Sequence, residues 1–193
     1  MKIVVGDTEL VEFKQAHTDA LFKLVNDSSI RQGMRNKQNI PYQDHLKWVS
    51  KNLLANKTTH LFMTYQDVHP IAVTLLKNLN NGSGELGIMV KDARQSRNSL
   101  LVSKLICGIL HYAYKDLKLD SLVMNIILDN KDSYNLARKI GAVDQYQNDT
   151  YLNFKLTKEK YLFLYLHQAM NRRFQPMVVQ TTVKEIAGSG LEC

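Results

Sequence analysis

The fold of this chain is decided by residues 84–141, which read "GELGIMVKDARQSRNSLLVSKLICGILHYAYKDLKLDSLVMNIILDNKDSYNLARKIG". The apolar run "ELGIMV" predicts a strand that leads into a polar, basic loop. From Ser99 to Leu117 apolar residues recur at helical spacing, which predicts a long and well-buried helix. The run "DSLVMNIIL" predicts a central strand buried on both faces, and "NKDSYNLARKIG" predicts a short helix that ends at Gly141. The stretch is therefore a β-loop-α-β-α unit.

The flanking segments add further strands and helices. "KIVVG" and "ELVEFK" predict an N-terminal hairpin, and "AHTDALFKLVND" and "IPYQDHLKWVSKNLLAN" predict two amphipathic helices. "HLFMTYQD", "IAVTLLKNL" and "TYLNFKLT" predict strands, and "KEKYLFLYLHQAM" predicts a helix. This order of elements indicates the α/β (α+β) class, with a mixed sheet and helices on both faces.

The length of 193 residues indicates one domain, which we expect over residues 1–172. Residues 173–193 are expected to form a C-terminal extension. Within it "FQPMVVQTTVKEIA" alternates like a strand and could pair with a sheet edge, including that of a second subunit in a homodimer, or could be disordered. The last residues, "AGSGLEC", are expected to derive in part from cloning.

The net charge of +7 favours anionic partners, which include nucleic acids, acidic membranes and phosphorylated small molecules. The basic residues are spread along the chain without a Lys/Arg run, so we expect no nucleic acid partner. No segment is apolar for long enough to span a membrane. Cys107 and Cys193 suggest neither a disulfide framework nor a metal site, which indicates a reducing cytoplasm.

Two stretches carry a resemblance to a known family. Residues 100–142 resemble the third helix, fifth strand and fourth helix of the GNAT superfamily of acyl-CoA-dependent N-acyltransferases, including Asn130 after the strand and a Lys-x-Gly ending at Lys139 and Gly141. The segment "VNDSSIRQGMRNKQNIPYQDHLKWVSKNL" is similar to the GNAT branch that acylates nucleotide-linked amino sugars, of pseudaminic-acid pathway type. The resemblance covers about residues 8 to 157.

This resemblance implies a mixed, mostly antiparallel central sheet and acetyl-CoA as co-substrate. The acceptor would be the primary amine of a small or nucleotide-linked amino sugar, which attacks the thioester directly. In relatives the fourth and fifth strands splay apart, and exposed N–H groups of the fourth strand bind the cofactor, which would implicate Met89 and Val90. The pyrophosphate would lie at the N-terminus of the following helix, where the helix dipole favours negative charge.

The phosphate loop departs from the family pattern, because both of its glycines are missing. Asn98 is the best substitute, since asparagine tolerates positive φ, and the arginines could add charge. The alternative is that the segment is only a basic surface turn. The loop residues expected to bind the cofactor are Arg94, Gln95, Ser96, Arg97, Asn98 and Ser99.

The resemblance also implies catalytic groups. Glu85, at the start of the fourth strand, could be the general base or a solvent-exposed glutamate. Many relatives use a tyrosine to protonate the leaving thiolate, but that position is Ala137 here. Ser133 aligns with a serine that, in the ribosomal-protein N-terminal acetyltransferase branch, has this role or contacts CoA, and Tyr134 is adjacent. Ser133 and Asp132 could instead only cap the helix. Asn130 could contact the cofactor or form a turn.

The acceptor is expected to meet Arg31, Met34 and Arg35, which lie between the two N-terminal helices, because arginines bind diphosphates bidentately. The alternative is that they are solvated loop residues. His45 lies beside the expected acceptor groove or is simply exposed on its helix. Two other functions remain open, namely acetylation of a protein N-terminus as in the ribosomal-protein branch, and a catalytically degenerate binding protein.

Overall fold

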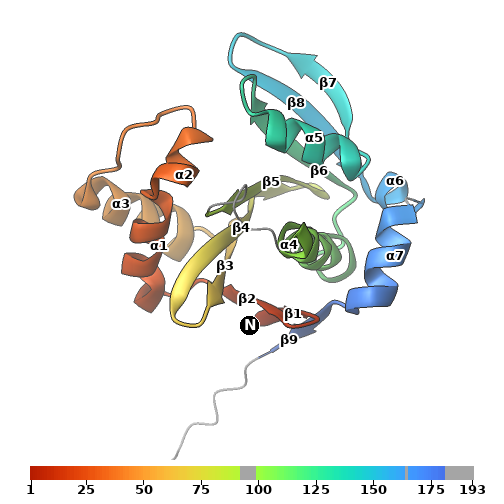
Figure 1. The fold of residues 1–193 in the computed structure, drawn as a ribbon, viewed down its shortest axis with the longest axis horizontal. Coiled ribbons are helices and arrows are strands. Elements are labelled where there is room, and N and C mark those ends of the chain that lie inside the picture. Colours follow the sequence, from red (N-terminus) through yellow and green to blue (C-terminus); the bar gives the residue numbers. More distant parts are fainter. Residues whose placement is uncertain (92–98, 164, 181–193) are drawn as a thin grey trace, which may run out of the picture.

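A computed structural model describes residues 1–91, 99–163 and 165–180 of the chain. Within these residues the strands form one nine-stranded sheet in the order β7-β8-β6-β5-β4-β3-β2-β1-β9 (Figure 1). The strands are β1 (Lys2–Val5), β2 (Thr8–Glu12), β3 (His60–Gln66), β4 (His69–Asn80), β5 (Ser83–Val90), β6 (Ser121–Ile127), β7 (Val143–Gln147), β8 (Tyr151–Thr157) and β9 (Met177–Val179).

Neighbouring strands are antiparallel everywhere except between β5 and β6, which are parallel. The helix that follows β5 makes the crossover that a parallel pair requires. The expected mixed, mostly antiparallel sheet of the α/β class is therefore confirmed.

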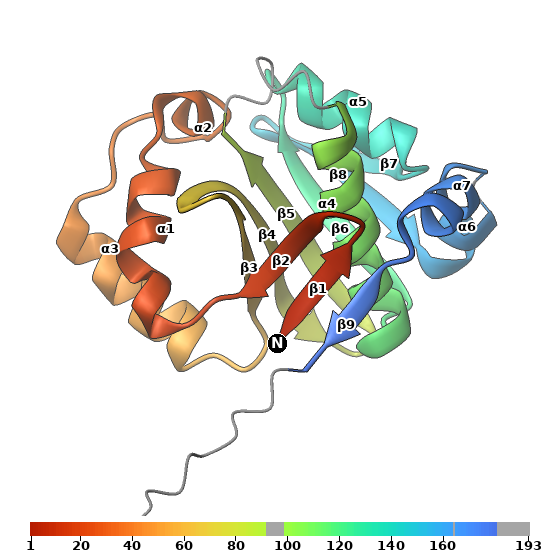
Figure 2. The ribbon, with the colours of Figure 1, turned by 60° about the horizontal axis from the view of Figure 1, so that its bottom comes forward.

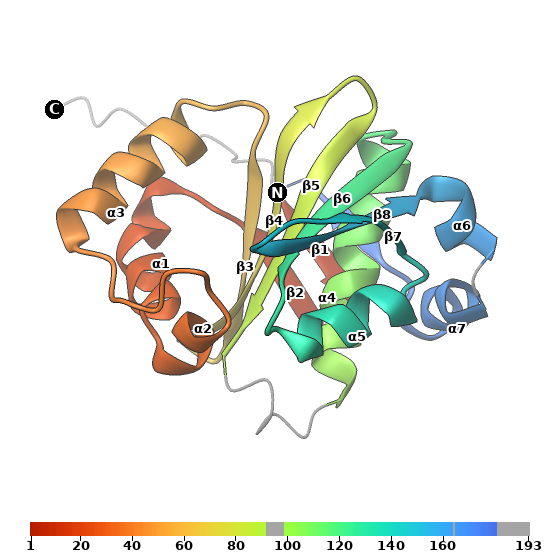
Figure 3. The ribbon, with the colours of Figure 1, turned by 90° about the horizontal axis from the view of Figure 1, so that it is seen from above.

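Helices lie on both faces of the sheet (Figures 1 and 3). On one face the described helices are α1 (Thr18–Val25), α2 (Ser28–Gln32) and α3 (Tyr42–Val49), the first preceded by a 3₁₀ turn (Gln15–His17) and the last extended by a π-helical turn (Ser50–Leu54). On the other face they are α4 (Ser99–His111), extended by a π-helical turn (Tyr112–Asp116), and α5 (Lys131–Lys139), α6 (Lys158–Phe163) and α7 (Tyr165–Phe174).

Each face has its own hydrophobic core. The larger core packs α4 and α5 against the sheet and includes the fully buried Leu105 and Ile109 of the predicted helix. The smaller core packs α1–α3 against β3 and β4 and includes Leu21, Leu24 and Val49. Apolar residues at helical spacing are expected to line the inward face of a helix, and these residues do so.

Two described elements, the short helix α2 and the edge strand β7, were not predicted from the sequence. The last predicted helix is described as α6 and α7 on either side of residue 164, which lies outside the described residues. The strand-like alternation after residue 173 does contain a strand, β9, which pairs antiparallel with β1 of the same chain (Figure 2). No helix in the described ranges is long and apolar enough to cross a membrane.

Candidate active site

The parallel strands β5 and β6 separate part-way along their length. They are paired only at Ser83–Ser121, Gly84–Leu122 and Glu85–Val123. Beyond that point β5 remains paired with β4 as far as Val90, and β6 remains paired with β8 as far as Ile127. Among the described strands none pairs with this second half of β5 on the β6 side. The sheet therefore contains an opening whose vertex is the Glu85–Val123 pair.

The register shows which backbone groups of β5 face this opening. The Lys91 N–H donates to the Ile71 carbonyl across the β4 ladder at 2.8 Å. Because N–H directions alternate along a strand, the Met89 N–H also points to β4, whereas those of Val90 and Ile88 point toward the opening. Of the two residues named from the resemblance, Val90 thus has its N–H on the expected side. Met89 instead packs its side chain against the smaller core.

The helix after the opening begins at Ser99, the first residue of α4. Arg94, Gln95, Ser96, Arg97 and Asn98 lie outside the described residues, as does the side chain of Ser99. The described part fits an acyl-CoA in two respects. Backbone N–H groups of β5 face an unpaired edge, and the N-terminus of α4 follows that strand, where a helix dipole favours phosphate.

Asn130 is the N-cap of α5, since its Oδ1 accepts a hydrogen bond from the Ser133 N–H at 3.0 Å. The expectation that Ser133 or Asp132 is the cap is therefore corrected. The amide Nδ2 of Asn130 donates to the Gly33 carbonyl at 3.4 Å, so the start of α5 contacts the end of α2. Figures 2 and 3 show these two helices at the same end of the molecule.

The two remaining candidates on α5 lie in different surroundings. Ser133 is half-buried in the first turn of the helix. Tyr134 packs edge-on against Phe154, with ring centroids 5.6 Å apart, at the border of the larger core. Its ring therefore contributes to the packing of α5 on the sheet.

Glu85 lies at the vertex of the opening, on the face that carries α1–α3 over the neighbouring strands. Its carboxylate accepts from Lys77 Nζ at 2.9 Å and from Asn78 Nδ2 at 3.2 Å. The side chain is only 22% exposed. The alternative of a solvent-exposed glutamate is thus corrected, because a lysine and an amide on β4 hold this carboxylate in place.

Among the residues expected to meet the acceptor, Arg31 is 7% exposed. Its Nη2 donates to the Asn36 carbonyl, and its Nε has no hydrogen-bond partner in the described part of the chain. Met34 packs against the smaller core and Arg35 is exposed. Of the three residues, Arg31 is therefore no solvated loop charge.

His45 is buried, with 2% of its surface exposed, and is neither an exposed residue nor a free group in a groove. Its Nε2 lies 3.1 Å from the Thr18 carbonyl, and its ring lies 5.3 Å from that of Phe22. Both contacts are with α1. His45 thus joins α3 to α1, which explains its burial.

Asp27 and Lys91 form a connection that the sequence did not reveal. Lys91 Nζ, just beyond β5, lies 3.0 Å from Asp27 Oδ2, and Asp27 is also the N-cap of α2. Burial raises the pKa of Asp27, but hydrogen bonds from Ser29 and Lys91 outweigh it and leave the pKa below its ordinary value. An aspartate directly before "SSI" was the available signal for a helix start.

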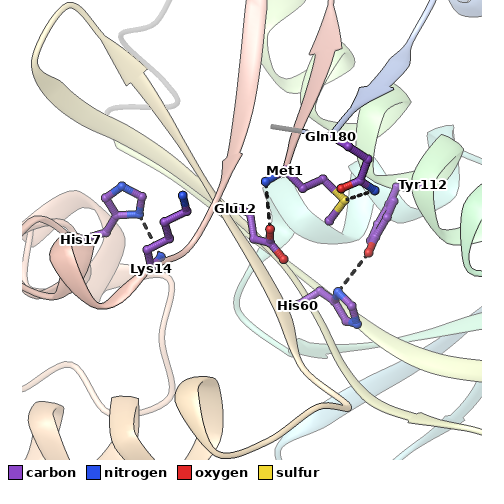
Figure 4. A network of polar contacts seen from close by, with 7 residues as sticks. All are labelled: Met1, Glu12, Lys14, His17, His60, Tyr112 and Gln180. Atoms are coloured by element: carbon purple, nitrogen blue, oxygen red, sulfur yellow. Dashed lines mark hydrogen bonds and ion pairs between the residues drawn. The ribbon is translucent and has the colours of Figure 1, made fainter. Parts of the chain in front are cut away.

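A second polar cluster lies on β2, β3 and the π-helical turn after α4 (Figure 4). The Tyr112 hydroxyl and His60 Nδ1 are 3.0 Å apart, and Glu12 pairs with the Met1 amino group at 3.1 Å. Burial lowers the pKa of His60 and raises that of Tyr112 to about 12. The resulting hydrogen bond between neutral groups ties α4 to the start of β3.

A family model described as "Acetyltransferase (GNAT) domain" matches residues 8–143. The chain belongs to this family. A curated relative, "Acetyltransferase PseH" of Campylobacter jejuni subsp. jejuni serotype O:23/36 (strain 81-176), is 26% identical over 125 residues, which are 65% of this chain and 76% of the relative. The protein is thus an acyltransferase of the GNAT type, and acetyl-CoA is its acyl donor.

Solved structures show the same fold at low sequence identity. The apo structure of FdhC, described as a nucleotide-linked sugar GNAT, has a TM-score of 0.72 at 15% identity and covers 90% of this chain and 98% of that one. Spermidine N-acetyltransferase from Vibrio cholerae, in complex with CoA and spermine, has a TM-score of 0.65 at 15% identity, with 79% and 96% covered. PseH from Campylobacter jejuni, in complex with acetyl coenzyme A, has a TM-score of 0.58 at 18% identity, with 78% and 99% covered.

Proposed function

We propose that this GNAT enzyme transfers the acetyl group of acetyl-CoA to the primary amine of a nucleotide-linked amino sugar. The observation that carries the proposal is the buried guanidinium of Arg31. Arg31 lies on α2, two residues before Gly33, whose carbonyl contacts the start of α5. Arg31 is therefore close in sequence to the point at which the end of α2 contacts the start of α5.

A buried charge is costly unless an opposite charge or a full set of hydrogen bonds compensates it. In the described ranges the guanidinium of Arg31 donates to one backbone carbonyl, that of Asn36, and pairs with no carboxylate. A phosphate would satisfy the remaining N–H groups, because guanidinium and phosphate match geometrically. The same cation would repel a polyamine. This supports an acceptor that carries phosphate over the spermidine of some structural relatives.

Acetyl-CoA supplies an acetyl group that is activated as a thioester. The N–H groups of Val90 and Ile88 would hold the donor along the opening, and the N-terminus of α4 would favour its phosphates. Glu85, at the vertex, would take a proton from the acceptor ammonium, directly or through water, so that the amine lone pair is free to attack. As the C–S bond breaks, Ser133 would give its hydroxyl proton to the departing sulfur and regain a proton from the acylated nitrogen, which becomes the neutral amide. We also propose a cytoplasmic location, in keeping with the free, buried thiol of Cys107.

The test is an acceptor panel measured by mass spectrometry, with acetyl-CoA as the donor. The panel contains UDP-linked hexoses with an amine at C2, C3 or C4, the corresponding free amino sugars, spermidine, and a peptide with a free N-terminus. We expect acetylation of a nucleotide-linked sugar, with at least tenfold lower kcat/KM for the free sugar because the phosphate contact is lost. Preference for spermidine or for the peptide would overturn the proposal.

A further inference from the structure

Three polar or aromatic side chains form a row across the outer strands of the sheet. Asn125 on β6 pairs directly with Asn153 on β8, and Asn153 pairs in turn with Tyr146 on β7. Directly paired residues carry their side chains on the same face of a sheet. The row Tyr146–Asn153–Asn125, called the amide row below, therefore runs perpendicular to three adjacent strands.

The amide row lies on the face that carries α1–α3 over the neighbouring strands. Alternate residues of β6 and β8, such as Met124 and Phe154, belong to the larger core under α4 and α5, so the row points to the opposite side. Asn125 and Lys155 are exposed there, and Tyr146 is 62% exposed. Figures 1 and 3 show α1–α3 beside β3–β5, whereas β7 and β8 extend away from these helices.

The two asparagines are bonded so that one amide end remains available. Asn153 is 6% exposed and donates through Nδ2 to Asn125 Oδ1 at 2.8 Å. The Nδ2 of the exposed Asn125 has no hydrogen-bond acceptor within the described part of the chain. Asparagine is depleted in strands because it neither packs nor branches well there. Their mutual hydrogen bond supports the pairing of β6 and β8, but it does not use the Nδ2 of Asn125.

The amide row is near the vertex at which the sheet opens. Asn125 follows Val123, the last partner of β5, by two residues, which corresponds to about 7 Å along the strand. Three adjacent strands span about 10 Å, a width that suits one pyranose ring with its substituents. The Asn125 end of the row is therefore the end near Glu85, the group that would take the amine proton, at about 8 Å between Cα atoms.

We propose that the amide row is the platform that recognises the sugar ring of the acceptor. Tyr146 offers an aromatic face for the C–H groups of the ring, and the Asn125 amide donates to a ring hydroxyl or an acyl substituent. The row contains no carboxylate, so it suits a neutral sugar ring better than a polyamine. This inference rests on the proposed function and specifies which residues select the sugar.

The test compares Asn125→Asp and Tyr146→Ala with a matched control, Val143→Ala, on the same strand as Tyr146. Asn125→Asp keeps an oxygen for Asn153 Nδ2, so the fold is retained, but it replaces the available donor with an acceptor. The measurements are the KM for a UDP-linked amino hexose, the KM for acetyl-CoA, and the melting temperature. We expect both row variants to raise the acceptor KM at least tenfold, with the acetyl-CoA KM and melting temperature unchanged. The control should change none of the three.

The outcomes separate this inference from the proposed function. If the wild-type enzyme acetylates a nucleotide-linked sugar and both row variants keep the acceptor KM within twofold, the platform is refuted while the function stands. If the wild-type enzyme acetylates spermidine and none of the sugars, both proposals fall together. A parallel rise in the KM of acetyl-CoA would assign the row to the donor site and would also refute the platform.

Discussion

Replacing Arg31 with methionine should weaken acceptor binding without weakening the fold. The methionine side chain retains most of the apolar packing of the arginine stem. The substitution removes one charge-assisted hydrogen bond to the Asn36 carbonyl, worth about 1.5–3 kcal/mol. It also removes the desolvation cost of a guanidinium that is 7% exposed, which is several kcal/mol. Asn36 is exposed, so its carbonyl can bind water instead.

These opposing contributions nearly cancel. The free energy of unfolding of Arg31→Met should therefore be at most about 1 kcal/mol below the wild-type value, or should exceed it. A decrease of that size lowers the melting temperature by about 2–4 °C. Losing a buried charge–phosphate contact costs about 2 kcal/mol or more, which corresponds to about a 30-fold lower kcat/KM for the acceptor. Calorimetry and initial-rate kinetics measure the two effects. The matched control is Arg35→Met, because Arg35 is a nearby arginine that is exposed. An unstable Arg31→Met variant with an unchanged acceptor KM would refute this reasoning, because it would make Arg31 a purely structural residue.

Four further substitutions test the fold and the catalytic assignment. Gly108→Ala would place a Cβ 2.8 Å from Val5 Cγ2. The overpacking should cost about 1–3 kcal/mol and outweigh the gain in helix propensity of about 1 kcal/mol. Urea unfolding should therefore show no increase in the free energy of unfolding. Glu85→Gln should lower kcat about 100-fold or more if Glu85 is the general base, whereas the control Lys77→Met should lower kcat much less. A Glu85→Gln variant whose kcat stays within threefold of the wild-type value would show that Glu85 is not the base. Burial holds the pKa of His60 below its ordinary 6.5. As the pH falls below 6.5, His60 therefore takes up a proton in the unfolded state before it does so in the folded state. Its contribution to the free energy of unfolding is complete above pH 6.5 and is lost as the pH falls toward the pKa of the folded state. In His60→Gln the free energy of unfolding, measured in urea between pH 5 and 8, should fall less steeply as the pH decreases. A slope equal to that of the wild type would contradict the assignment of this pH dependence to His60.

Long periodic segments made most of the fold predictable from the sequence. The β-loop-α-β-α unit has many apolar residues at a consistent spacing, so α4, β6 and α5 followed directly. The edge strand β7 reads "VDQYQ", and all five of its residues are exposed. No pattern of burial therefore marks it, and it becomes a strand because β8 offers a pairing edge. The five-residue helix α2 is too short for periodicity to appear.

The site was less predictable because it depends on register and on contacts between distant segments. The direction of the Met89 N–H follows from which residues of β4 and β5 pair, and one residue of slip would reverse it. His45 is buried because α1 lies against α3, which the polar first turn of α3 did not indicate. Asn130 was expected to contact the cofactor or to form a turn. Its N-cap bond to Ser133 is local to α5, whereas its contact with Gly33 depends on the position of α2.

The missing tyrosine of α5 also has a structural reason. Ala137, at the position where many relatives carry it, is 1% exposed and belongs to the larger core. A phenol at this position would have to displace side chains in a filled interior, which is destabilising. Ser133 precedes Ala137 by four residues and so lies on the same stripe of the helix, one turn closer to its N-terminus. In this chain a hydroxyl on that stripe is thus carried by the first turn of α5, next to the Asn130 contact with Gly33, where the proposed donor and acceptor sides would meet.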